Sequence, residues 1–150
     1  MAEIEELYQA IILDHNARPR HFGLLDTPTH ASEGRNPLCG DELLVQLVVD
    51  DNRIREVGFT GQGCAISKAS CSIMTETVSE KTVGEALEIC QRIISILKGE
   101  GEEDSLPQDS ELVALLGVKK FPARLKCATL AWHALEGALN GQESVCTEDS

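Results

Sequence analysis

The chain has 150 residues and a net charge of −12, from 13 basic and 25 acidic side chains. This acidic surplus argues against a nucleic-acid partner, because binding a phosphate backbone requires basic side chains that displace counterions. No apolar run approaches the ~20 residues that span a membrane, and the acidic start is unlike a signal peptide, so we expect a cytoplasmic protein with no membrane partner. We expect one domain over 1–141 and a polar, frayed tail over 142–150.

The first half of the chain predicts one helix followed by strands. Apolar residues at helical spacing over 3–14 predict an amphipathic helix, which the Arg18-Pro19-Arg20 segment ends. Three later segments have the character of strands, over 29–35, 43–49 and 54–60. The turn residues at 50–52 join the last two of these into a hairpin. His15 and His21 flank the basic loop and could form part of a docking surface.

The second half predicts helices. Helical periodicity marks four segments, over 65–78, 82–97, 111–117 and 122–139. The second of these begins with a capping box formed by Thr82 and Glu85. The acidic, turn-rich stretch 99–110 is expected to connect the second and third helices at the surface. The order of elements predicts an α+β fold, in which a small antiparallel sheet of about three strands packs against four to six helices.

Six cysteines suggest metal binding, sulfur chemistry or burial, because cytoplasmic thiols are normally reduced. Cys90 lies within an unbroken apolar stripe and is expected in the core. Cys146 lies in the polar tail and is expected to be an incidental exposed thiol. Cys71 follows Cys64 at a distance of about 10 Å along a regular helix, which is too far for both thiols to bind one metal ion.

Cys39, Cys64 and Cys127 are the cysteines whose surroundings suit chemistry. Cys39 precedes Gly40 and Asp41 in a loop before a strand, so that the carboxylate can point to the same place as the thiol. Cys64 follows a glycine-rich segment at a strand-to-helix junction, where the backbone N–H groups of the helix favour a thiolate.

Cys127 lies on the predicted final helix, about 200° round from Leu125 at 100° per residue. We therefore expect Cys127 to face away from the inward stripe that contains Leu125 and Trp132. Arg124 lies one helical turn earlier on the same side as Cys127, where its guanidinium would favour the thiolate.

Three thiolates and one carboxylate form a chemically sound tetrahedral zinc site, and thiolates also suit an iron–sulfur cluster. The residue pattern leaves open whether the three cysteines and Asp41 share one site or whether the thiols are unrelated. The carboxylate is a harder ligand than sulfur and would be the more exchangeable one, which suits a site that opens.

Three motifs of the chain resemble those of the U-type proteins of iron–sulfur cluster assembly, and the resemblance covers about residues 3–140. They are N-P-x-C-G-D at 36–41, G-x-G-C-A-I-S at 61–67 and F-P-A-R-x-K-C-A at 121–128. Two features resemble the SufU branch of this family. Lys126 stands where the IscU scaffold branch has a histidine. The 62 residues between Cys64 and Cys127 exceed the spacing of the IscU branch and resemble the insertion of the SufU branch. Cys71 departs from the family pattern, which has a small residue there.

The resemblance implies a zinc cofactor bound by Cys39, Asp41, Cys64 and Cys127. It implies that Cys39 accepts sulfur as a persulfide from a SufS-type cysteine desulfurase, whose histidine takes the place of Cys39 on zinc. Arg124 would guide this exchange or hold the partner, and downstream Suf scaffold proteins are further candidate partners. The alternatives are a scaffold that assembles and passes on a [2Fe–2S] cluster at the same residues, and a closed, non-catalytic zinc-stabilised domain.

Overall fold

The computed structural model describes residues 2–101 and 111–147. Within these ranges the helices are α1 (Ala2–Ala17), α2 (Ala65–Val78), α3 (Val83–Leu97) and α4 (Leu125–Leu139), with the 3₁₀ helices η2 (Glu111–Lys120) and η3 (Pro122–Arg124). The strands are β1 (His30–Asn36), β2 (Asp41–Asp50), β3 (Arg53–Gln62) and β4 (Ser144–Cys146). The predicted α+β fold is therefore confirmed. Most of the connection predicted over 99–110 lies outside the described residues.

The sheet has the strand order β3-β2-β1-β4. β2 pairs antiparallel with both β1 and β3, which confirms the predicted hairpin. Asp51 and Asn52 both adopt positive φ angles in the tight turn between β2 and β3, and residues of this type tolerate that conformation best after glycine. The turn therefore matches the right-handed twist of the two strands.

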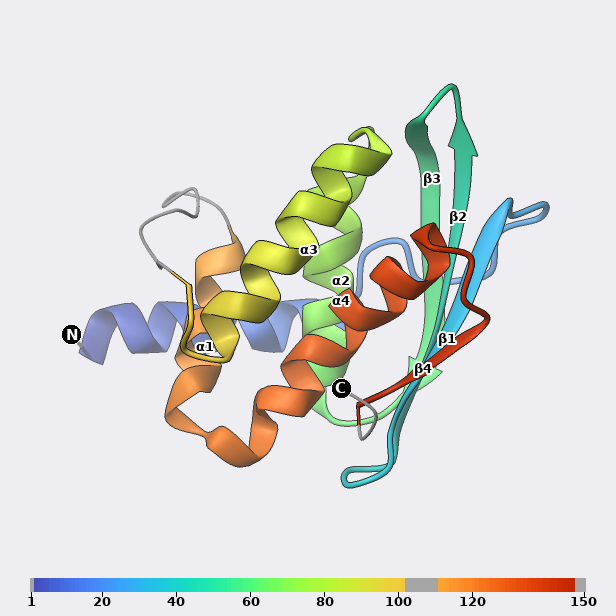
Figure 1. The fold of residues 1–150 in the computed structure, drawn as a ribbon. Helices are drawn as coiled ribbons and strands as arrows, with labels where there is room; N and C mark the ends of the chain where they lie inside the picture. Colours follow the sequence, from blue (N-terminus) through green and yellow to red (C-terminus); the bar gives the residue numbers. More distant parts are fainter. Residues whose placement is uncertain (1, 102–110, 148–150) are drawn as a thin grey trace.

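The helices lie together on one side of the sheet, as Figure 1 shows. α4 packs directly on β1 and β2, α2 contacts both α4 and β3, and α1 packs farther out on α2 and η2. The interior includes a buried polar link, in which the Trp132 indole N–H donates to Ser70 Oγ at 3.1 Å and Ser70 Oγ donates to the Ala128 carbonyl at 2.6 Å. This link ties α4 to α2 and so fixes the helix that carries Cys127.

Helix α3 begins as its sequence predicts. The Thr82 hydroxyl accepts a hydrogen bond from the Glu85 backbone N–H at 3.2 Å, and the Glu85 carboxylate accepts one from the Thr82 backbone N–H at 3.0 Å. Hydrogen bonds from the backbone N–H and the side chain of Thr82 hold the pKa of the Glu85 carboxyl group below its usual value. No helix within the described residues is long and apolar enough to cross a membrane.

The C-terminal segment differs from the prediction. Residues 144–146, which we expected within a frayed tail, form β4 and pair with β1 in parallel, so the sheet is mixed and has four strands. Gly137 on α4 leaves room for this strand, because a Cβ atom there would lie 2.7 Å from Val145 Cγ1. Thr147 follows β4 and is only 1% exposed. The packing of β4 against β1 and α4 therefore orders a stretch whose polar sequence indicates disorder.

The opening helix also differs from the prediction in one respect. His15 is fully buried, not part of a docking surface. Its Nδ1 lies 2.7 Å from Ser72 Oγ on α2 and its Nε2 lies 3.0 Å from a Glu111 carboxylate oxygen on η2. Both ring nitrogens are thus used to join α1 to its neighbours. His21 remains partly exposed and contacts Glu76 at 3.2 Å.

Candidate metal centre

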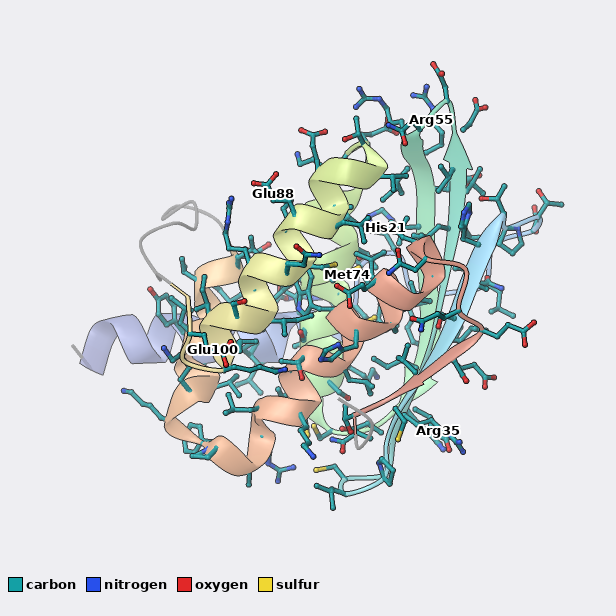
Figure 2. All side chains as sticks on the ribbon, in the orientation of Figure 1. His21, Arg35, Arg55, Met74, Glu88 and Glu100 are labelled. Carbon is teal, nitrogen blue, oxygen red and sulfur yellow. The ribbon has the colours of Figure 1, made fainter. Side chains whose placement is uncertain are left out.

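Three of the predicted ligands converge at one end of the sheet. Cys39 lies in the turn between β1 and β2, Asp41 is the first residue of β2, and Cys127 lies in the first turn of α4. Their ligand atoms all lie within 4.8 Å of one another, and the two sulfur atoms are 3.3 Å apart. Figure 2 marks this end by the labelled Arg35 near the end of β1, whereas Arg55 marks the opposite end near the hairpin turn.

Asp41 is held from two sides and is only 1% exposed. One carboxylate oxygen accepts a hydrogen bond from the backbone N–H of Cys64 at 2.9 Å, and the other accepts one from the Asn36 side-chain amide at 3.2 Å. A Cβ atom at Gly63 would collide with this carboxylate and with the Ser67 hydroxyl. The second glycine of the G-x-G-C motif is therefore required for the close approach of the segment between β3 and α2 to Asp41.

Cys64 lies beside this group. It occupies the N-cap position of α2, where its side chain makes no capping hydrogen bond, and its backbone N–H donates to Asp41 Oδ1. Its thiol is half-buried and interacts with the side chain of Cys127. The structure therefore brings the fourth predicted ligand next to the other three, although it is not within 4.8 Å of all of them.

Cys127 is the most enclosed thiol of the group. Burial is the largest cause that raises its pKa, followed by its hydrogen bonds with Cys39, Asp41 and Cys64. Arg124 faces the same cluster: its Nη1 lies 3.8 Å from Cys39 Sγ, and the Cys127 thiol and the nearby Cys64 and Cys39 raise the pKa of the guanidinium. The exposed guanidinium of Arg124 therefore faces the thiols.

The division of the final helix into one inward stripe and an opposite face needs correction. We expected it to face away from a buried stripe on the final helix, but Cys127 itself is fully buried, and Leu125 is only half-buried. The reason is that α4 is enclosed on most of its circumference by β1, β2, α2, α3 and η2. The helix begins at Leu125, after Pro122–Arg124 form a separate 3₁₀ turn.

The donor set fits a zinc ion. In a tetrahedral zinc site with bonds of about 2.3 Å to sulfur, two thiolates lie roughly 3.8 Å apart, so the sulfur atoms of Cys39 and Cys127 need to separate only slightly. Asp41 supplies a carboxylate oxygen next to both. Cys39 is exposed, whereas Asp41 and Cys127 are buried. The centre is therefore closed on the protein side and open at Cys39.

The remaining cysteines lie elsewhere. Cys71 and Cys90 are fully buried in the core, as expected for Cys90, and burial raises the pKa of both thiols. Neutral, enclosed thiols of this kind are poor nucleophiles. Cys146 lies in β4 and is half-buried, not fully exposed as we expected.

Replacing Cys90 with serine should lower stability without affecting the metal centre. A serine hydroxyl at this fully buried site would need a hydrogen-bond partner in an apolar environment, and we expect a loss of about 1–3 kcal/mol in the free energy of unfolding. Urea unfolding of the metal-free chain measures the loss. A selective loss of zinc binding, with unchanged stability, would overturn the assignment of Cys90 to the core.

Sequence reasoning missed the role of Asn36. This residue opens the N-P-x-C-G-D motif, and its side chain is fully buried. Its amide nitrogen donates to Asp41 Oδ2 at 3.2 Å and to Cys127 Sγ at 3.5 Å. The sequence did contain an indication of this role. Asn36 is an amide residue at the end of a predicted strand, and the short turn that follows pairs it with Asp41.

Comparison with known proteins gives consistent matches over most of the chain. The family model for the NifU-like N-terminal domain matches residues 7–143. An iron–sulfur cluster assembly scaffold protein IscU of Streptococcus pyogenes serotype M1 is 39% identical over 93% of this chain and 86% of its own length. The zinc-dependent sulfurtransferase SufU of Bacillus subtilis (strain 168) is 37% identical over 95% of both chains.

A solved structure agrees with these matches. It is the crystal structure of a protein from Fervidobacterium islandicum AW-1, named as a candidate iron–sulfur cluster assembly scaffold for the SUF system. Its TM-score against this chain is 0.81, with 34% identity over 90% of this chain and 98% of the other.

Proposed function

Since this chain belongs to the NifU-like N-terminal domain family, the U-type proteins of iron–sulfur cluster assembly, we propose that it is a zinc-dependent sulfur acceptor. Cys39 would take persulfide sulfur from a SufS-type cysteine desulfurase, and downstream Suf scaffold proteins are the candidate recipients. Relatives named as a scaffold and as a sulfurtransferase are similarly close, at 39% and 37% identity. The choice between these roles therefore depends on the residues of this chain.

The difference in exposure between the ligands carries the proposal. Cys39 is exposed and Cys64 is half-buried, whereas Asp41 and Cys127 are 1% and 0% exposed. Sulfur transfer between proteins requires a thiolate that the partner can reach, and of the three thiols Cys39 is the most exposed. The hydrogen bonds to both Asp41 oxygens also support Cys39, and not the carboxylate, as the ligand that exchanges.

The transfer itself is a thiol–persulfide exchange. The Cys39 thiolate attacks the terminal sulfur of the persulfide on the desulfurase; a new S–S bond forms to Cys39, the old S–S bond breaks, and the cysteine of the desulfurase leaves as a thiolate. No external oxidant or reductant is needed, because one persulfide is formed for each one consumed. Arg124, 3.8 Å from Cys39 Sγ, can stabilise the negative charge as it moves between sulfurs. Bound zinc would keep the thiols ionised and shielded until the partner docks.

The second candidate function is a scaffold for a [2Fe–2S] cluster at the same residues. It is favoured by the relatives named as scaffolds. Against it, this chain has Lys126 at the position before Cys127, where the scaffold branch offers a histidine as an additional ligand. A closed zinc-stabilised domain is the third candidate, and the exposure of Cys39 argues against it.

Metal and sulfide content, combined with a desulfurase assay, distinguishes these three functions. The chain purified without oxygen should contain about one zinc ion and no acid-labile sulfide, and it should accelerate a SufS-type desulfurase. Iron with an equal amount of sulfide would instead support the scaffold. Zinc without any acceleration of the desulfurase would support the closed domain.

A further inference from the structure

The buried half of the metal centre is connected to the C-terminal strand through one side chain. Asn36 ends β1 and is fully buried. The β1–β2 register places it opposite Asp41, and the parallel β1–β4 register pairs its neighbour Arg35 with Cys146. Thr147 therefore follows β4 directly alongside Asn36. Its hydroxyl lies 3.1 Å from Asn36 Oδ1.

Each polar atom of the Asn36 side chain has a defined partner. The amide nitrogen donates one hydrogen to Asp41 Oδ2 at 3.2 Å and the other to Cys127 Sγ at 3.5 Å. The amide oxygen accepts from the Thr147 hydroxyl. Reversing the amide would turn its oxygen toward the Asp41 carboxylate, which is itself an acceptor. The hydroxyl of Thr147 and the carboxylate of Asp41 thus favour the same orientation.

We infer that Asn36 is a positioning residue for the buried ligands Asp41 and Cys127, and that Thr147, carried by β4, orients it. One amide group that donates to both ligands fixes their positions relative to each other, as hydrogen-bonding partners of metal ligands do. The side chain of Asn36 gives Cys39 no comparable support. Asn36 contacts Cys39 through the backbone, where the Cys39 N–H donates to the Asn36 carbonyl at 3.3 Å in the turn between β1 and β2. Through Thr147 and Asn36, β4 therefore holds Asp41 and Cys127 in place, whereas the exposed Cys39 remains able to move.

This inference rests on the zinc site proposed above, and its test measures metal affinity and not activity. Zinc affinity of the reduced full chain is determined by competition with a chromophoric chelator, and bound Co²⁺ reports thiolate ligation by its absorption. Hydrogen-bonding partners of metal ligands typically contribute 10–100-fold to affinity. We expect Asn36→Ala to weaken zinc binding within that range and Thr147→Val, one bond further out, to weaken it roughly tenfold.

Matched variants separate positioning from general loss of structure. Thr147→Ser keeps the hydroxyl and should restore the affinity of the original chain. Thr77→Val removes a hydroxyl that bonds to the Ile73 carbonyl within α2, and it should leave affinity unchanged. Thr147→Val should have no further effect in the Asn36→Ala background, because the amide that it orients is then missing.

The outcomes are distinct for the two proposals. Normal zinc affinity in Thr147→Val, with the original chain binding one zinc ion, overturns the inference and leaves the proposed function intact. The inference is also overturned if the losses of zinc affinity in Asn36→Ala and Thr147→Val add up in the double variant. If Thr147→Val does not fold, the Asn36→Ala variant decides alone, and unchanged affinity there overturns the inference. An original chain that binds no zinc overturns both proposals.

Discussion

The Cys39→Ala variant is expected to lose sulfur acceptance, with the desulfurase rate falling to that of the desulfurase alone. Alanine removes the attacking thiolate, and loss of a nucleophile typically costs two orders of magnitude or more in rate. Cys39 is exposed, so its side chain contributes little to packing. We therefore expect the free energy of unfolding of the metal-free chain to change by less than about 0.5 kcal/mol.

Two measurements check this expectation. The first is the rate of alanine and persulfide formation by the desulfurase with each variant, and the second is detection of a persulfide on Cys39 by mass spectrometry. Cys146→Ala is the matched control, because it removes a half-buried thiol outside the ligand cluster and should leave stimulation intact. Full stimulation by Cys39→Ala would exclude Cys39 as the acceptor. Loss in both variants would instead point to a relay between the two thiols.

The Cys127→Ser variant is expected to lose zinc affinity by more than about 100-fold. Cys127 is buried between Cys39 Sγ at 3.3 Å and the Asn36 amide at 3.5 Å, so it would be the innermost sulfur ligand. Altering a hydrogen-bonding partner of a ligand already costs 10–100-fold, and removing a ligand should cost more. A serine hydroxyl is a far weaker zinc ligand than a thiolate, although it can still accept the hydrogen bond from Asn36.

Chelator competition measures this loss, with Cys90→Ser as the control. Both residues are fully buried cysteines on helices, so the same substitution is made at the same degree of burial. Only Cys127→Ser should lower zinc affinity, whereas Cys90→Ser should lower stability alone. Equal zinc affinities in the two variants would remove Cys127 from the proposed ligand set.

Local sequence determined most of the elements and the chemistry of the ligands. The period of apolar residues located α2 and α3, the turn residues located the β2–β3 hairpin, and Thr82 with Glu85 marked the start of α3. The three motifs singled out the cysteines and the aspartate that the structure gathers. These features depend on neighbours within a few residues, so a sequence pattern is sufficient to predict them.

Tertiary structure alone decided how the centre is enclosed. The spacing around one helix indicates which residues share a face, but it does not indicate how many faces are covered; α4 is enclosed on most of its circumference, and Cys127 is therefore buried. The parallel pairing of β4 with β1 joins residues more than a hundred positions apart. Thr147 and Asn36 meet only through that pairing. A polar tail becomes ordered because its partners are supplied by distant strands and helices, and no local pattern records such partners.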